Sequence, residues 1–106
     1  MASLATLIDA RTPIVLWGTG TLTLHLLRNG RFRQLNVTAF VDRNSQFQGK
    51  TIDGLPVLAP EALKKLDEMV LVVSRSYERE IAASIREHFK LENSVWKLFD
   101  RANATT

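Results

Sequence analysis

A short glycine-containing segment is the first part of the 106-residue chain whose residue types and spacing could do chemistry. Gly18-Thr19-Gly20-Thr21 follows an apolar run and precedes a leucine-rich stretch. Glycines at such a position let the backbone approach a ligand closely, and the N-terminus of a following helix presents unpaired N–H groups to an anion. Gly18 and Gly20 match the first two glycines of the dinucleotide-binding pattern G-x-G-x-x-G. The segment therefore predicts binding of a nucleotide phosphate.

The pattern is incomplete, because Thr23 stands where the third glycine is expected. That glycine normally permits close packing of the helix on its strand, so its replacement argues against a tightly bound NAD. An acidic residue nevertheless lies at the required distance, since Asp42 follows Gly20 by 22 positions (42 − 20), at the end of a β-rich run. Such a residue is placed to accept a hydrogen bond from a ribose hydroxyl. We predict that Asp42 and its neighbour Arg43 contact a nucleotide. The alternative is that the glycines form only a strand–helix turn and that Asp42 caps a loop.

A third polar segment, Ser74-Arg75-Ser76, follows the most strand-like run of the chain. In an open parallel sheet this position lies beside the glycine turn, where the strand order reverses and ligands bind. Ser74 and Arg75 are therefore candidate ligand contacts, and the Arg75 guanidinium could pair with a phosphate or a carboxylate. The residue types favour the alternative, in which Ser76 caps the following helix and Arg75 is solvated.

The remaining polar residues form no catalytic or metal-binding constellation. The chain has no cysteine, which excludes disulfides, thiolate catalysis and cysteine-ligated zinc. His25 and His88 lie on separate predicted helices and are interpreted as surface or packing residues. Lys50 and Asp53 could reach a ligand from a loop, although the turn dipeptide Asp53-Gly54 alone explains Asp53. We therefore predict no catalytic residue, no metal site and no independent catalytic activity in this chain.

The elements that must position these segments alternate between strand and helix. Apolar or β-branched runs predict strands at 14–17, 37–41, 55–58, 69–73 and 94–99. Helices are expected at 2–9 and 21–29, from Pro60 through Leu66, and where Tyr77, Ile81, Ile85 and Phe89 recur every four residues with their side chains inward. Trp17 and Trp96 are predicted core residues, and Pro56 predicts that its strand lies at an edge.

This alternation predicts the α/β class. We expect a three-layer Rossmann-like fold, with a mostly parallel five-stranded sheet in the order of about 3-2-1-4-5 and helices on both faces. The length predicts one domain over residues 1–106, with a frayed tail at 102–106.

The charge is modest and dispersed: 14 Lys and Arg against 11 Asp and Glu give +3, and the basic residues are scattered. We therefore expect no nucleic-acid partner. The lack of a long apolar run and of a secretory signal predicts no membrane association and a cytoplasmic location.

Three motifs in a fixed order carry a family resemblance. They are residues 14–20 (Ile-Val-Leu-Trp-Gly-Thr-Gly), residues 40–42 (Phe-Val-Asp) and residues 49–57 (Gly-Lys-Thr-Ile-Asp-Gly-Leu-Pro-Val). The chain resembles, over about residues 13–90, the Rossmann-like domain at the N-terminus of bacterial sugar O-acyltransferases that modify nucleotide-linked amino sugars. It is also similar to the C-terminal domain of sugar C-methyltransferases.

The resemblance implies a nucleotide-like ligand, either a nucleotide-sugar or an NAD(P)-like nucleotide, held by Gly18, Thr19, Gly20 and Asp42. It also implies a role in sugar modification and polysaccharide biosynthesis. The 106 residues contain neither a hexapeptide-repeat region nor a domain for S-adenosylmethionine, so the partner expected is another enzyme domain or subunit. The alternative is a non-catalytic structural or interaction domain with a degenerate nucleotide site.

Overall fold

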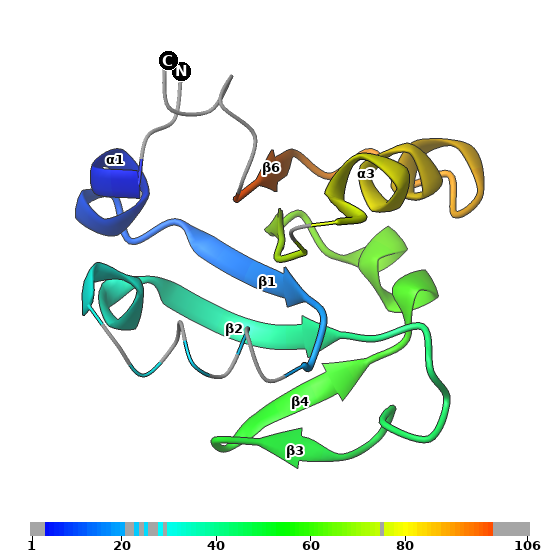
Figure 1. Cartoon of the computed structure of the whole chain (residues 1–106), viewed down its shortest axis with the longest axis horizontal. Coiled ribbons are helices and arrows are strands. Elements are labelled where there is room, and N and C mark those ends of the chain that lie inside the picture. The colour runs from blue at the N-terminus through cyan, green and yellow to red at the C-terminus, as the bar shows by residue number, and fades with distance from the viewer. Residues whose placement is uncertain are drawn as a thin grey trace.

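The computed structural model describes residues 4–20, 23, 25, 28, 30–74 and 76–98. Six strands form one sheet in the order β3-β4-β2-β1-β5-β6. Their bounds are β1 (Pro13–Trp17), β2 (Asn36–Val41), β3 (Thr51–Ile52), β4 (Leu55–Leu58), β5 (Met69–Val72) and β6 (Val95–Lys97). Among the described residues, the helices with defined bounds are α1 (Leu4–Asp9) and α3 (Glu78–Glu87), with 3-10 helices η1 (Gly30–Gln34) and η2 (Pro60–Lys65). Figure 1 shows the strands fanning across the molecule, with α1 and α3 at opposite sides.

Strand β1 is the centre of the sheet. It pairs in parallel with β2 on one side, where Leu16 lies opposite Phe40, and with β5 on the other, where Leu16 lies opposite Leu71. Every residue of β1 after Pro13 is buried. This burial explains the unbroken apolar run in the sequence, because a strand covered on both faces has no solvent side on which to alternate polar residues.

Helices cover both faces of the sheet, as predicted. Ile14 and Leu16 point to one face, where they pack with Leu7 of α1 in a core that residues of η1 border. Val15 and Trp17 point to the opposite face, where η2 and α3 supply the buried residues of a second core. The two faces of β1 therefore anchor two apolar layers, and the predicted three-layer α/β architecture is confirmed.

The sheet has six strands rather than the five predicted, because a hairpin extends it beyond β4. Asp53 and Gly54 both have positive φ angles, +51° and +80°. This tight turn folds Thr51–Ile52 back as β3, antiparallel to β4, with Thr51 opposite Pro56. Strand β4 is therefore not at the edge, and the expectation drawn from Pro56 was wrong. The order of the other five strands agrees with the predicted 3-2-1-4-5.

The start of α3 also differs from the prediction. Tyr77 is the N-cap residue, with φ −124° and ψ 11°, and its side chain is 65% exposed rather than turned inward. The four-residue period does not extend to Tyr77 because its backbone is not yet helical. Ile81, Ile85 and Phe89 do pack on the sheet. Ser76 does not cap the helix: the Ser74 hydroxyl oxygen accepts the N–H of Tyr77 at 3.1 Å.

Three further expectations are met only in part or not tested. The helix expected from Pro60 is a 3-10 helix that ends at Lys65. Thr23 and His25 are helical, and Arg28 lies in a turn. The other residues of the predicted 21–29 helix lie outside the described residues, as do residues 2–3, Phe99 and the tail at 102–106. Among the described helices, none has the length and apolar character needed to cross a membrane.

Candidate functional site

The carboxyl ends of three parallel strands meet at one cleft. Gly18 follows β1, Asp42 follows β2, and Ser74 comes two residues after β5. The structure brings six predicted site residues together in a cleft of about 500 Å³, a size typical of small-molecule sites. They are Gly18, Thr19, Gly20, Asp42, Arg43 and Ser74. The other two, Thr21 and Arg75, lie outside the described residues.

The two glycines of the turn have different reasons to be glycine. Gly18 has φ +122°, a conformation that side chains disfavour, and its N–H donates to the Val41 carbonyl at 2.8 Å. A Cβ there would find ordinary contacts only, the nearest being Thr23 Oγ1 at 3.5 Å. A Cβ on Gly20 would meet no atom within 4 Å. The backbone conformation at position 18 therefore favours glycine, whereas the absence of a side chain at Gly20 leaves open space at the cleft.

Asp42 is held from both its side chain and its backbone. Its Oδ2 accepts the Thr19 hydroxyl at 2.6 Å, and its Oδ1 accepts the Asn44 N–H at 2.8 Å. Its carbonyl oxygen accepts Gln48 Nε2 at 2.8 Å. Each carboxylate oxygen has more than one acceptor position, so both can still receive a hydrogen bond from a ligand hydroxyl. The half-buried carboxylate is thus held in one orientation while hydrogen-bond acceptor positions on both of its oxygens remain available to a ligand.

Arg43 is positioned by an aromatic pair at the wall of the cleft. Its guanidinium carbon lies 5.4 Å from the ring centroid of Phe89, a cation–π geometry. Phe89 in turn packs against Trp17, with ring centroids 5.6 Å apart. His88, which is exposed, meets Phe89 edge-on. The predicted core residue Trp17 is buried and also lines the cleft, so it connects the site to the sheet.

The contribution of α3 to this cleft was not predicted from the sequence. Tyr77, Glu80, Ile81 and Ser84 all line it. The spacing of Glu80, Ile81 and Ser84 places these three on one face of α3, and Tyr77 joins them from the N-cap position. That spacing was visible in the sequence, but Tyr77 and Ile81 were interpreted only as core residues.

A second hollow of about 400 Å³ lies at the opposite ends of the strands, between η2 and the segment that precedes β6. Lys64, Asp67, Lys90 and Glu92 contribute to it, with both charge signs mixed, and none of the predicted site residues does. Ligands of open parallel sheets bind at the carboxyl ends of the strands. We therefore place the candidate site in the cleft of Gly18 and Asp42.

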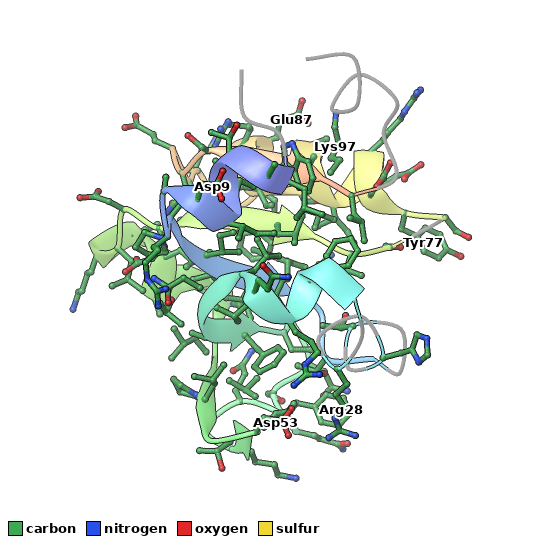
Figure 2. The ribbon with its side chains drawn as sticks, turned by 90° about the vertical axis from the view of Figure 1, so that its left-hand side faces the viewer. Asp9, Arg28, Asp53, Tyr77, Glu87 and Lys97 are labelled. Atoms are coloured by element: carbon green, nitrogen blue, oxygen red, sulfur yellow. The ribbon has the colours of Figure 1, made fainter. Side chains whose placement is uncertain are left out.

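Two loop residues considered as ligand contacts lie elsewhere. Neither Lys50 nor Asp53 lines the cleft. Asp53 instead pairs with Arg28, with Oδ1 and Nη2 3.2 Å apart, and Figure 2 shows the two side chains next to each other. Within the described part of the chain, no three His, Asp or Glu side chains are grouped so that they could hold a metal ion.

The parallel sheet, the helices on both faces and the cleft at the carboxyl strand ends define the class of Rossmann-like α/β domains. Within that class, the chain belongs to the family described as C2185-like, N-terminal, whose model matches residues 10–94. No curated protein sequence matches the chain significantly.

Solved structures of similar fold include two different proteins. One is UDP-D-quinovosamine 4-dehydrogenase from Vibrio fischeri: TM-score 0.57, 21% identity, 89% of this chain and 85% of that chain covered. The other is RSP, a Rex-family repressor: TM-score 0.62, 14% identity, 88% of this chain and 47% of that chain covered. The same repressor in complex with β-NADH has a TM-score of 0.57 and 14% identity, over 81% of this chain and 45% of that chain. The chain thus spans about half the length of the repressor, and the likenesses show a shared fold.

Proposed function

We propose that this chain is a nucleotide- or nucleotide-sugar-binding module of a larger sugar-modifying system, in which another domain or subunit carries out the reaction. The observation that carries the proposal is the cleft that unites the glycine turn, Asp42, Arg43 and Ser74. Structures of the same fold support it, since they include a UDP-sugar dehydrogenase and a repressor with bound NADH.

Each part of the cleft suits a different part of such a ligand. The backbone of Gly18–Gly20 would approach a phosphate at the start of the helical segment that contains Thr23 and His25. The oriented Asp42 carboxylate would accept hydrogen bonds from ribose hydroxyls.

Arg43 and Ser74 supply hydrogen-bond donors at the two sides of the glycine turn. Thr21 and Arg75 remain ligand contacts proposed from the sequence alone.

The sugar-modifying context rests on the motif resemblance to acyltransferase and methyltransferase domains. The site is proposed to bind rather than to catalyse, with the reaction assigned to the partner. An acyl- or methyl-transferring partner, acting in polysaccharide biosynthesis, would then use the ligand that this module holds.

The proposal is tested by titrating isotopically labelled protein with a UDP-sugar, NAD and coenzyme A while amide chemical shifts are followed. We expect at least one nucleotide to shift the amides of Gly18–Gly20 and Asp42. Gly20→Ala should weaken binding, because its methyl group occupies the approach to the turn, yet leave the unfolding midpoint unchanged. If none of the three ligands moves these amides, the proposal is wrong.

The sheet edge favours a second candidate, a non-catalytic interaction domain. Strand β6 ends the strand order, and no described strand pairs with its outer edge. Such an edge can pair with another chain. Sedimentation of the chain at increasing concentration tests this candidate, since self-association without nucleotide binding would support it. A monomer that binds nucleotide tightly would exclude it.

A further inference from the structure

The face of α3 that lines the cleft carries a set of residues suited to one part of a nucleotide. Building on the proposed function, we propose that Tyr77, Glu80, Ile81 and Ser84 form the nucleobase subsite. We further propose that Glu80 selects bases presenting adjacent N–H donors, guanine above all, and disfavours uracil. Glu80, Ile81 and Ser84 lie on one face of α3 and Tyr77 is its N-cap, and all four line the same cleft as Gly18 and Asp42.

Tyr77 and Ile81 provide the apolar surface that a base needs. Tyr77 is 65% exposed, although it is a large aromatic residue, and Figure 2 shows it at the outer margin of the molecule. Its backbone is held by the Ser74 hydroxyl, which comes from the end of β5. An exposed aromatic ring at a cleft offers a stacking platform for any base, because every base has a π-face. Ile81 lies one turn further along and is half-buried.

Glu80 supplies the part of the subsite that discriminates between bases. An ionised carboxylate only accepts hydrogen bonds, with two oxygens side by side. The Watson–Crick edge of guanine offers two neighbouring donors, the ring N–H and the exocyclic amino group. Uracil offers a single N–H between two carbonyl oxygens, which the carboxylate would repel. Adenine and cytosine each have one amino group on this edge, so their affinities for the subsite should lie between those of guanine and uracil.

The charges of the cleft also dictate the orientation of the ligand. Asp42 and Glu80 are acidic and Arg43 is basic, so the described lining carries one excess negative charge. Phosphates are therefore disfavoured beside Glu80 and favoured at the backbone N–H groups of the glycine turn. With the ribose at Asp42, the base then faces α3. The same arrangement explains why an acidic side chain is tolerated in a site for an anion.

Binding of GDP, ADP, CDP and UDP to the whole chain, measured by calorimetry, tests the role of Glu80. We expect GDP to bind most tightly and UDP least tightly. Glu80→Gln should reduce the ratio of the UDP and GDP dissociation constants by roughly three- to tenfold, because an amide offers a donor to uracil and loses the charge. Glu87→Gln, on the exposed end of the same helix, is the matched control and should leave the ratio unchanged.

The stacking role of Tyr77 is tested with two variants. Tyr77→Ala should weaken all four nucleotides by roughly tenfold, whereas Tyr77→Phe should preserve their affinities. Ribose 5-phosphate, which has no base, should bind both variants equally. Phe47→Ala removes another exposed aromatic ring outside the cleft and serves as the control.

Two outcomes separate the inference from the function on which it rests. Nucleotides that shift the Gly18–Gly20 amides but bind Glu80→Gln and Tyr77→Ala with unchanged affinity and unchanged base preference overturn the subsite and leave the proposed function intact. Failure of all four nucleotides to bind overturns the subsite, and the proposed function falls with it only if the UDP-sugar, NAD and coenzyme A also leave the Gly18–Gly20 amides unmoved.

Discussion

The hydroxyl of Thr19 donates a 2.6 Å hydrogen bond to Oδ2 of Asp42, joining two residues that are 23 positions apart. The bond links the turn after β1 to the end of β2. Because the opposite oxygen of the same carboxylate accepts the Asn44 N–H, the carboxylate cannot rotate without losing a partner. The side chain proposed to contact the ribose is thus oriented by the loop proposed to contact the phosphate.

Replacing Thr19 by valine should loosen this coupling. Valine has nearly the same shape but no hydroxyl, so Asp42 loses one of its two side-chain partners. We expect the nucleotide dissociation constant to rise about threefold to tenfold, equivalent to roughly 1 kcal/mol for one hydrogen bond. Thr19→Ser retains the donor and should bind as the unchanged protein does. Weakening by serine but not by valine would show that the methyl group, not the hydroxyl, matters.

Gly18 and Gly20 should respond differently to alanine. Gly18→Ala must hold a side chain at φ +122°, which costs about 1–3 kcal/mol of folding free energy even though no atom blocks the Cβ. Gly20→Ala should leave the unfolding free energy within about 0.5 kcal/mol. Urea denaturation of the two variants checks the difference. A stable Gly18→Ala protein would show that the turn can adopt another conformation.

The stability of the β3–β4 hairpin should depend on the Asp53 backbone more than on its ion pair. Arg28 and Asp53 are 64% and 45% exposed, so Arg28→Ala should cost less than about 0.5 kcal/mol. Asp53 has φ +51°, a conformation that asparagine tolerates and alanine does not. We expect Asp53→Ala to cost about 1 kcal/mol and Asp53→Asn to cost little. Thermal denaturation in low and high salt separates the two effects, since only the ion pair is screened.

Arg43 and Phe89 should be energetically coupled. The guanidinium lies 5.4 Å from the ring, at an exposed position, so a coupling of about 0.5–1 kcal/mol is expected. A double-mutant cycle with Arg43→Gln and Phe89→Leu measures it, because leucine retains apolar packing without a π-face. Additive effects of the two substitutions would show that Arg43 owes its position to other contacts.

Ile85 should be the principal anchor of the helix that lines the cleft. Its side chain is fully buried against β1 and β5 residues, so Ile85→Ala should cost about 2–5 kcal/mol and Ile85→Val about 0.5–1.5 kcal/mol. Chemical denaturation checks these values. The valine variant should retain nucleotide affinity, because Ile85 itself does not line the cleft.

Periodicity and turn chemistry identified most of the fold and much of the candidate site. The buried run at β1 could be recognised because strands covered on both faces lose polar alternation. The site residues Gly18, Asp42 and Ser74 could be placed together because parallel strands end at a common edge. Strand β3 was missed because two residues carry too little pattern to distinguish a strand from a loop.

Local sequence patterns were sufficient to predict the five longer strands, and at which strand ends the polar residues lie. The tertiary structure alone showed that side chains of α3 and its N-cap share the cleft with them. Tyr77 turned outward because its backbone precedes the helix, although it fits the apolar period of Ile81 and Ile85. The hydrogen bond between Thr19 and Asp42 likewise depends on the register of β1 and β2, which no local pattern encodes. This register is set by pairing between residues far apart in the chain, so it becomes visible only when the sheet is assembled.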